Sequence, residues 1–376
     1  MMKLIFALDS FKGTISSEKT IELLTKAAHE VFGDCETQGV LIADGGEGTT
    51  DAVIRARQGE RVYAEVHGPL MEPVRAYFGK FSEKEAILEM AQASGLPLVP
   101  EGERNPLNTT TYGTGKLVKA ALDMGFREIA IGGSAINDGG MGFARALGVR
   151  FLDAAGNPLE GRGRDLERVA HIDMSGLDGR VKDTQFTVMC DVTNPLCGKD
   201  GATYTFGPQK GATPEILERL EQGMQNYQEV IIREFGVNPD KTPGSGAAGG
   251  LGTALMVYLG TKMQSGIETV LDLIRFDDIL EGADLVVTGE GRTDWQSCFG
   301  KVLQGVGDRG EAHGVPVVAL SGGLGPGYES IYDHGVESIL TTVDGPMPLE
   351  DALARAEELC EKAALRLFRL IRVGMG

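Results

Sequence analysis

Several residue patterns that commonly mark a function are scarce or missing in this sequence. None of its five cysteines forms a CxxC pair, and an odd number does not suit a disulfide framework. No run of 18 apolar residues occurs, so no membrane-spanning helix is expected. The N-terminus runs directly into Asp9 and lacks the longer apolar stretch and cleavage site of a signal peptide. We therefore expect a cytoplasmic protein with free thiols and without a zinc site.

Basic residues are also in short supply. The chain has 36 Lys and Arg against 54 Asp and Glu, a formal net charge of −18. An acidic surface repels nucleic acid and anionic lipid, so we expect neither as a partner. It would repel an anionic small molecule as well. A site for such a ligand must therefore be locally rich in backbone N–H groups, lysines or metal ions.

The common catalytic and nucleotide-binding signatures are mostly absent. Neither GxxxxGK[ST] nor GxSxG occurs, and none of the five histidines lies in a cluster of glycine and aspartate. A catalytic base, if there is one, is then expected to be a carboxylate. A GxGxxG pattern does occur at Gly244, Gly246 and Gly249, but no predicted strand precedes it. An NAD-linked hydroxy-acid dehydrogenase therefore stays only as a less favoured alternative.

Glycine is abundant, and its 54 residues gather in short clusters. In six places an apolar run ends and a turn of Gly, Ser, Asn, Asp or Glu follows at once; the runs end at Leu8, Ala43, Ile131, Cys190, Thr288 and Leu320. In open α/β sheets, ligands bind beyond the carboxyl ends of the strands. Glycine-rich turns that lead into helices present N–H groups that suit phosphate. Carboxylates among them indicate Mg²⁺, so the pattern is typical of phosphoryl transfer.

Both ends of the chain alternate between apolar strands and helices. Near the N-terminus, strands are expected at 3–8 and 40–43, and helices at 18–32 and 49–57. Near the C-terminus, the expected strands are 284–288, 315–320 and 337–343, with helices around 301–313, near Tyr328 and at 349–371. Such alternation predicts a parallel sheet covered on both faces. We expect residues 1–60 and 273–376 to form one doubly wound α/β domain together.

The middle of the chain, residues 61–272, has a different pattern. Apolar residues alternate at 62–66 and 74–78, which is typical of an antiparallel pair with one exposed face. Helices are expected at 111–124, 138–147, 214–235 and 247–260. This segment is predicted to be an inserted α/β domain with a mixed sheet. We expect the active site in the cleft between the two domains.

The glycine and carboxylate clusters, in their order along the chain, resemble the bacterial glycerate kinase family of the first type. The matching segments are residues 9–13 (DSFKG), 43–49 (ADGGEGT), 132–140 (GGSAINDGG), 191–196 (DVTNPL), 205–211 (TFGPQKG), 246–252 (GAAGGLG) and 288–294 (TGEGRTD). The resemblance covers nearly the whole chain. It implies a flavodoxin-like domain with an inserted α/β domain, and a kinase that uses ATP and Mg²⁺. The implied acceptor is D-glycerate, with 2-phosphoglycerate favoured over 3-phosphoglycerate as the product.

We assign individual roles from the clusters themselves. Asp191 is the first choice for the base and Asp138 the second, and Lys12 is the third catalytic candidate. The substrate-binding candidates are Ser10, Lys12, Ser134, Asn137, Asn194 and Lys210. The phosphate- and nucleotide-binding candidates are Gly45, Gly46, Gly289, Gly291, Lys301, Ser321, Gly322 and Gly323. The candidate metal ligands are Asp44, Glu290 and Asp294.

Two further functions remain open at this point. One is a kinase of another small hydroxy acid, because the acceptor pocket cannot be deduced from these motifs. The other is a non-catalytic sensor of sugar acids, which the number of clustered carboxylates disfavours. The protein is expected to act as a monomer or a homodimer.

Overall fold

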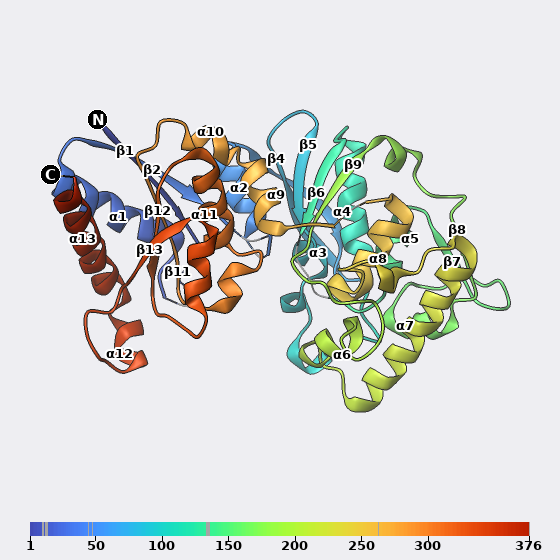
Figure 1. The fold of residues 1–376 in the computed structure, drawn as a ribbon. Helices are drawn as coiled ribbons and strands as arrows, with labels where there is room; N and C mark the ends of the chain where they lie inside the picture. The colour runs from blue at the N-terminus through green and yellow to red at the C-terminus, as the bar shows by residue number, and fades with distance from the viewer. Residues whose placement is uncertain are drawn as a thin grey trace. The chain divides into compact units, whose positions relative to one another are not determined.

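The chain folds into two compact units. A computed structural model describes residues 1–9, 11, 14–43, 45–46, 48–132, 136–261 and 263–375. Residues 1–44 and 266–376 make up the first unit, and residues 45–265 make up the second. Figure 1 shows the two ends of the chain, coloured blue and red, within the same unit.

The first unit is built on a five-stranded parallel sheet. Its strands, in the order in which they lie side by side, are β2 (Cys35–Leu41), β1 (Met2–Leu8), β11 (Leu285–Glu290), β12 (Val317–Ser321) and β13 (Val336–Thr341). Numbered by their order within the unit, the strands run 2-1-3-4-5. That order is the flavodoxin-like arrangement, and it reverses direction between β1 and β11. The expected doubly wound α/β fold with a flavodoxin-like sheet is confirmed.

Helices cover both faces of this sheet. On one face, α1 (Ser17–Phe32) and α13 (Ala356–Gly374) lie side by side over Leu4, Phe6 and Leu8 of β1 (Figure 1). On the other face, α11 (Val302–His313) packs on β1, β11 and β12. Because both faces are covered, every residue of β12 is buried. Three helices complete the unit: α9 (Gly266–Leu273), α10 (Phe276–Leu280) and α12 (Leu349–Ala354).

The second unit contains a mixed six-stranded sheet. Its order is β10 (Met263–Gln264), β9 (Gln185–Met189), β6 (Glu128–Gly132), β5 (Glu85–Glu89), β4 (Pro73–Lys80) and β3 (Glu60–His67). The pairs β3–β4 and β4–β5 are antiparallel, and the remaining pairs are parallel. A small antiparallel pair joins β7 (Arg150–Leu152) to β8 (His171–Asp173). The helices are α2 (Thr49–Ala56), α3 (Ala91–Ser94), α4 (Tyr112–Asp123), α5 (Met141–Ala146), α6 (Ala202–Phe206), α7 (Pro214–Phe235) and α8 (Ala247–Leu259).

The boundaries expected from the sequence differ from this division. Residues 45–60 were expected with the chain ends, but α2 packs on β4 and β5 and belongs to the second unit. Residues 266–272, expected in the insertion, belong to the first unit because α9 packs on α10 and α11. The expected helix 349–371 is interrupted at Arg355, which lies between α12 and α13.

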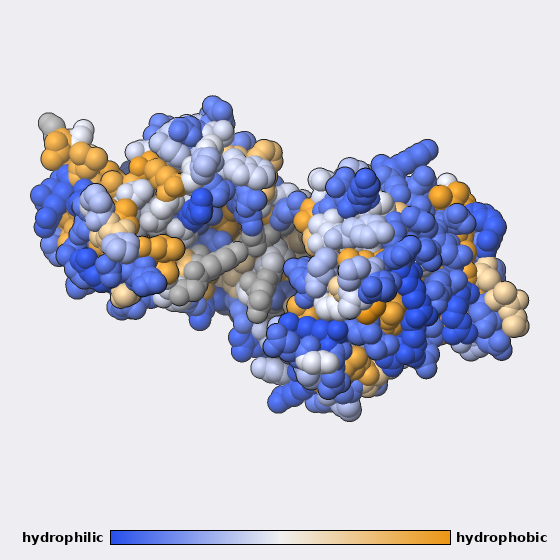
Figure 2. Space-filling model, turned by 90° about the horizontal axis from the view of Figure 1, so that it is seen from below, coloured by the Kyte–Doolittle hydropathy of each residue, from blue (hydrophilic) through white to orange (hydrophobic). Residues whose placement is uncertain are grey.

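The face drawn in Figure 2 is largely hydrophilic, with smaller hydrophobic areas between the hydrophilic regions. Among the residues that the structure describes, no helix combines the length and apolar character that a membrane span requires.

Candidate active site

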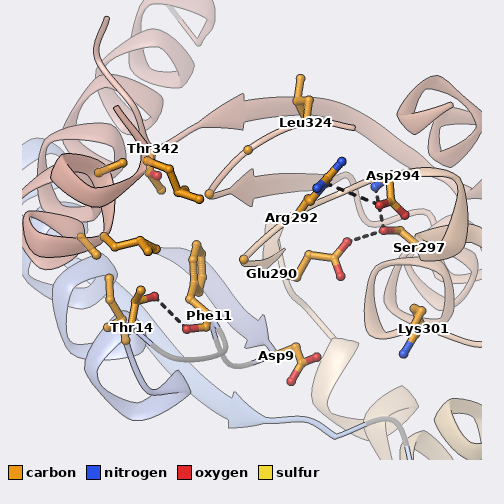
Figure 3. Close-up of a pocket in the computed structure, with 18 of the residues that line it drawn as sticks. Asp9, Phe11, Thr14, Glu290, Arg292, Asp294, Ser297, Lys301, Leu324 and Thr342 are labelled. Atoms are coloured by element: carbon orange, nitrogen blue, oxygen red, sulfur yellow. Dashed lines mark hydrogen bonds and ion pairs between the residues drawn. The ribbon is translucent and has the colours of Figure 1, made fainter. Parts of the chain in front are cut away.

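A pocket of about 770 Å³ lies in the first unit, where β1, β11 and β12 reach their carboxyl ends. The sheet order reverses between β1 and β11, and such a reversal is where α/β sheets of this kind bind their ligands. Figure 3 shows Asp9 and Glu290 near the middle of the pocket. Asp294, Ser297 and Lys301 lie on one side of them, and Phe11, Thr14 and Thr342 on the other.

Asp9 and Glu290 come together because of the register of two neighbouring strands. Leu8 of β1 pairs with Gly289 of β11, and the N–H of Asp9 donates to the Gly289 carbonyl at 3.1 Å. Each acidic residue follows one member of this pair, so both carboxylates lie at the same edge of the sheet. Asp9 was missing from the predicted site residues, although its position directly after the first apolar run was a usable signal.

Glu290 is half-buried, and burial raises the pKa of its carboxyl group. The Ser297 hydroxyl opposes this shift by donating to Oε1 at 2.5 Å, and the nearby Lys301 ammonium also lowers the pKa. The Asp9 carboxylate raises it further, because two like charges disfavour each other. A pair of carboxylates in this arrangement is well suited to a divalent cation, which would relieve the repulsion between them.

The turns after β11 and β12 are held together by hydrogen bonds. The N–H of Thr293 donates to the Gly323 carbonyl at 3.0 Å, and the Gly322 N–H donates to the Glu290 carbonyl at 3.1 Å. Ser321 is buried, and its hydroxyl donates to the Gly323 carbonyl at 2.8 Å. A side chain at position 322 would collide with the Gly291 carbonyl, since its Cβ would lie only 2.3 Å from that oxygen. These contacts fix the glycine-rich turns along the pocket.

The carboxylate of Asp294, a predicted metal ligand, already accepts hydrogen bonds within its own turn. Its Oδ1 accepts from the Gln296 N–H at 3.0 Å and caps the 3₁₀ helix Trp295–Cys298. Its Oδ2 lies 3.6 Å from Arg292 Nε. The side chain of Arg292 is 66% exposed. Asp294 lines the pocket, but these contacts favour a role in shaping the turn.

Asn137, Asp138 and Lys210 form a separate buried cluster in the second unit. Asp138 is fully buried, and its carboxylate accepts from the Thr111 N–H at 2.6 Å and from the N–H groups of Gly140 and Gly142. Lys210 Nζ donates to the Ile136 carbonyl at 3.0 Å, and burial lowers its pKa to about 7. Among the described residues, Asn137 Oδ1 has no hydrogen-bond partner. The geometry gives Asp138 a positioning role between α4 and α5.

The predicted phosphate-binding turn at Gly45 and Gly46 leads into a helix whose N-terminus is already occupied. Glu89, at the end of β5, accepts from the Thr50 N–H at 2.7 Å and from the Gly48 N–H at 3.2 Å. A carboxylate therefore sits where α2 would otherwise offer free N–H groups to an anion. Glu89 was missing from the predictions because its strand carries no glycine-rich cluster.

The remaining predicted residues occupy different places. Asp191 is exposed after β9, and Asn194 Nδ2 donates to the Asp200 carbonyl at 2.7 Å. Glu290, Gly291, Asp294, Lys301, Gly322 and Gly323 line the one pocket, with Gly289 and Ser321 buried directly behind it. The predictions for Ser10, Lys12, Asp44 and Ser134 fall outside the described residues. No group of three or more Asp, Glu, His or Cys that could hold a metal ion occurs within the described part of the chain.

Comparisons with known proteins agree on one family. Residues 4–372 match the model of the glycerate kinase family. A protein of Bacillus subtilis (strain 168) named glycerate kinase is 44% identical, with 99% of this chain and 98% of that protein covered. A protein of Escherichia coli (strain K12) named glycerate 2-kinase is 41% identical, with 100% of this chain and 99% of that protein covered. The crystal structure of a candidate glycerate kinase 2 from Salmonella typhimurium LT2 matches with a TM-score of 0.87 at 41% identity, covering 100% of this chain and 99% of that one.

Proposed function

The chain belongs to the glycerate kinase family, and from this premise we propose that it transfers the γ-phosphoryl group of ATP to D-glycerate. The proposed product is 2-phosphoglycerate, because a relative with full-length coverage is named glycerate 2-kinase. The observation that carries the proposal is the pocket at the β1–β11 reversal, which combines the carboxylates of Asp9 and Glu290 with a lysine and glycine-rich turns. These are the groups that phosphoryl transfer needs for positioning and charge neutralisation.

In this proposal, Asp9 and Glu290 would hold a magnesium ion beside the phosphates of the nucleotide. One or two carboxylates are the usual protein share of such a site, so the residues present fit the ion. The metal would neutralise charge on the phosphates during transfer. Lys301 precedes the N-terminus of α11 and would pair with a phosphate oxygen. The N–H groups of the turn 322–323 would orient the phosphate chain.

For the acceptor, we propose a base and substrate contacts among residues of the second unit. Asp191 is the proposed base, since it is an exposed carboxylate at the end of a strand. Asn137 and Lys210 are the proposed contacts of the glycerate, because the cluster joins a buried lysine amine to an amide oxygen that has no partner among the described residues. Asp138 keeps this cluster in place and is no longer proposed as a base, because backbone donors and a hydroxyl occupy both of its oxygens.

The deciding experiment is phosphorus NMR of the product formed from D-glycerate, ATP and Mg²⁺. We expect the resonance of 2-phosphoglycerate and an equal amount of ADP. The resonance of 3-phosphoglycerate would overturn the regiochemistry, and the absence of ADP release would overturn the kinase assignment. A coupled assay of ADP release with tartronate, lactate and hydroxypyruvate would show whether another hydroxy acid is preferred.

The dehydrogenase alternative loses its structural support. The segment with Gly244, Gly246 and Gly249 follows a 3₁₀ turn at Pro239–Lys241, whereas a dinucleotide motif follows a strand. Its glycines are explained by packing, since a Cβ at Gly246 would lie 2.0 Å from the Pro195 carbonyl oxygen. A Cβ at Gly249 would lie 1.6 Å from the carbonyl oxygen of Ile136.

A further inference from the structure

One side of the pocket in the first unit is apolar, and no role in phosphate or metal binding accounts for it. Its apolar lining residues are Phe11 and Ile15 beside the start of α1, and Leu349, Ala352, Leu353 and Ala356 on α12 and the start of α13, with Thr14 and Thr342 among them. Leu349 is 72% exposed and Leu353 is 49% exposed. Two leucines on consecutive turns of a helix, left uncovered at the edge of a charged pocket, indicate a ligand with an apolar part.

The apolar and charged sides belong to one continuous pocket. The labelled residues in Figure 3 run from Phe11 and Thr14, past Asp9 and Glu290, to Lys301. A ligand that fills this pocket must therefore be amphipathic, with an apolar group at one end and negative charge at the other. Glycerate has three carbons and no apolar group, so it does not match the α12 side. A nucleoside triphosphate matches both.

Gly323 supplies a second, independent observation. It lines the pocket, and a Cβ at this position would meet no atom of the described residues within 4 Å. Its φ is not in the left-handed region that demands glycine. Neither packing nor backbone conformation therefore explains the missing side chain at this position. Close approach of a ligand to the backbone is the remaining physical reason for a glycine there.

We propose that the apolar side of the pocket, formed by Phe11, Ile15, Leu349 and Leu353, binds the purine base of ATP, and that Gly323 lets the nucleotide pass close to the backbone. This inference rests on the proposed kinase function and adds the place of the base to it. The base contacts are remote from the reacting phosphoryl group. Their loss should therefore weaken ATP binding without slowing the chemical step.

The first test replaces Leu353 by asparagine, which has a similar size but is polar. We expect the KM for ATP to rise about fivefold, while kcat and the KM for glycerate stay within about twofold. The matched control is Leu370→Asn, at a leucine of α13 that is 69% exposed and does not line the pocket. Circular dichroism of both variants checks that they fold like the wild type.

The second test adds a methyl group at Gly323. We expect Gly323→Ala to keep the stability of the wild type and to raise the KM for ATP about tenfold, because the methyl group would occupy space that the nucleotide needs. Gly179→Ala is the control: a Cβ added at that glycine would also meet no atom within 4 Å, but the residue lies in the second unit. The control should leave every kinetic constant unchanged.

A direct binding measurement separates this inference from the proposed function. Trp295 is the only tryptophan of the chain, it is 55% exposed, and its neighbours Asp294 and Gln296 line the pocket. Titration of the protein with ATP and Mg²⁺, without glycerate, should change its fluorescence, with a higher Kd for the Leu353 and Gly323 variants.

The outcomes are distinct. If the wild type makes 2-phosphoglycerate but both variants bind ATP like the wild type, the base is elsewhere and the kinase function stands. If the Leu353 change raises the KM for glycerate alone, the apolar side serves the acceptor and the inference fails. If ATP binds and the variants weaken it, but no glycerate is phosphorylated, the proposed function fails and the base site stands.

Discussion

The two aspartates that the sequence offered as candidates for the base are placed very differently by the fold. Asp138 and Asp191 both follow apolar strands and were both candidates for the base. Asp138 is fully buried among backbone donors at the starts of α4 and α5, whereas Asp191 is exposed. The difference in burial between the two aspartates depends on the tertiary position of α4, whose first turn packs against Asp138. No local pattern around residue 138 carries that information.

This contrast gives a paired prediction. Asp138→Asn should lower the free energy of unfolding by about 3 kcal/mol, because an amide NH₂ would face N–H donors in a buried site. Asp191→Asn should change it by less than about 0.5 kcal/mol but lower kcat by about 10²–10⁴ if Asp191 is the base. Urea unfolding and a coupled ADP assay measure both effects. An Asp191→Asn enzyme with full turnover would remove the base assignment.

At the scale of elements, the hydrophobic periodicity of the sequence predicted several strands and helices correctly. The strand at 3–8, the antiparallel pair and the helix at 214–235 agree closely with β1, β3–β4 and α7. β2 was predicted only at 40–43 but begins at Cys35, because it is an edge strand whose residues 36, 38 and 39 are not buried. The site was predicted through its glycines and carboxylates. The apolar side was missed because Leu349 and Leu353 read as one face of an ordinary amphipathic helix.

Helix α8 shows why its glycines cannot be judged from composition alone. Gly249, near its start, and Gly260, at its end, have nearly equal φ values of 67° and 69°. A Cβ at 249 would lie 1.6 Å from the Ile136 carbonyl oxygen, whereas a Cβ at 260 would have no atom within 4 Å in the part of the chain that the structure describes. A residue other than glycine would therefore be strained at both positions. Only at position 249 would its Cβ also collide with the backbone that precedes Asn137.

We therefore expect Gly260→Ala to cost about 1 kcal/mol of stability, from the left-handed conformation alone. Gly249→Ala should cost at least about 3 kcal/mol, because a carbonyl group of the neighbouring turn would have to move. Urea unfolding of both variants measures the difference between these two costs. Equal losses would show that the turn at Ile136 yields easily, and would weaken its role in holding Asn137 and Lys210.

At the scale of the whole molecule, the two units have separate hydrophobic cores. The core of the first contains residues of β1, α1, β11, β12 and α13. The buried residues of the second core lie between Val66 and Tyr258. The second unit is continuous in sequence, while the first needs both ends of the chain. We therefore expect each core to melt on its own, so that a ligand held by one unit would stabilise that unit.

The final prediction joins this architecture to the proposed nucleotide site. Calorimetry of the full chain should show two transitions, and saturating ATP with Mg²⁺ should raise one of them by about 5–10 °C, as expected for a ligand at about 100 times its Kd. The pocket lies wholly within the first unit, so residues 45–265 expressed alone should melt cooperatively at a temperature that ATP does not change. The Gly323→Ala variant, with its tenfold higher Kd, should lose about half of the shift in the full chain. A shift in the isolated segment would instead place the nucleotide on the second unit, against the assignment of the β1–β11 pocket.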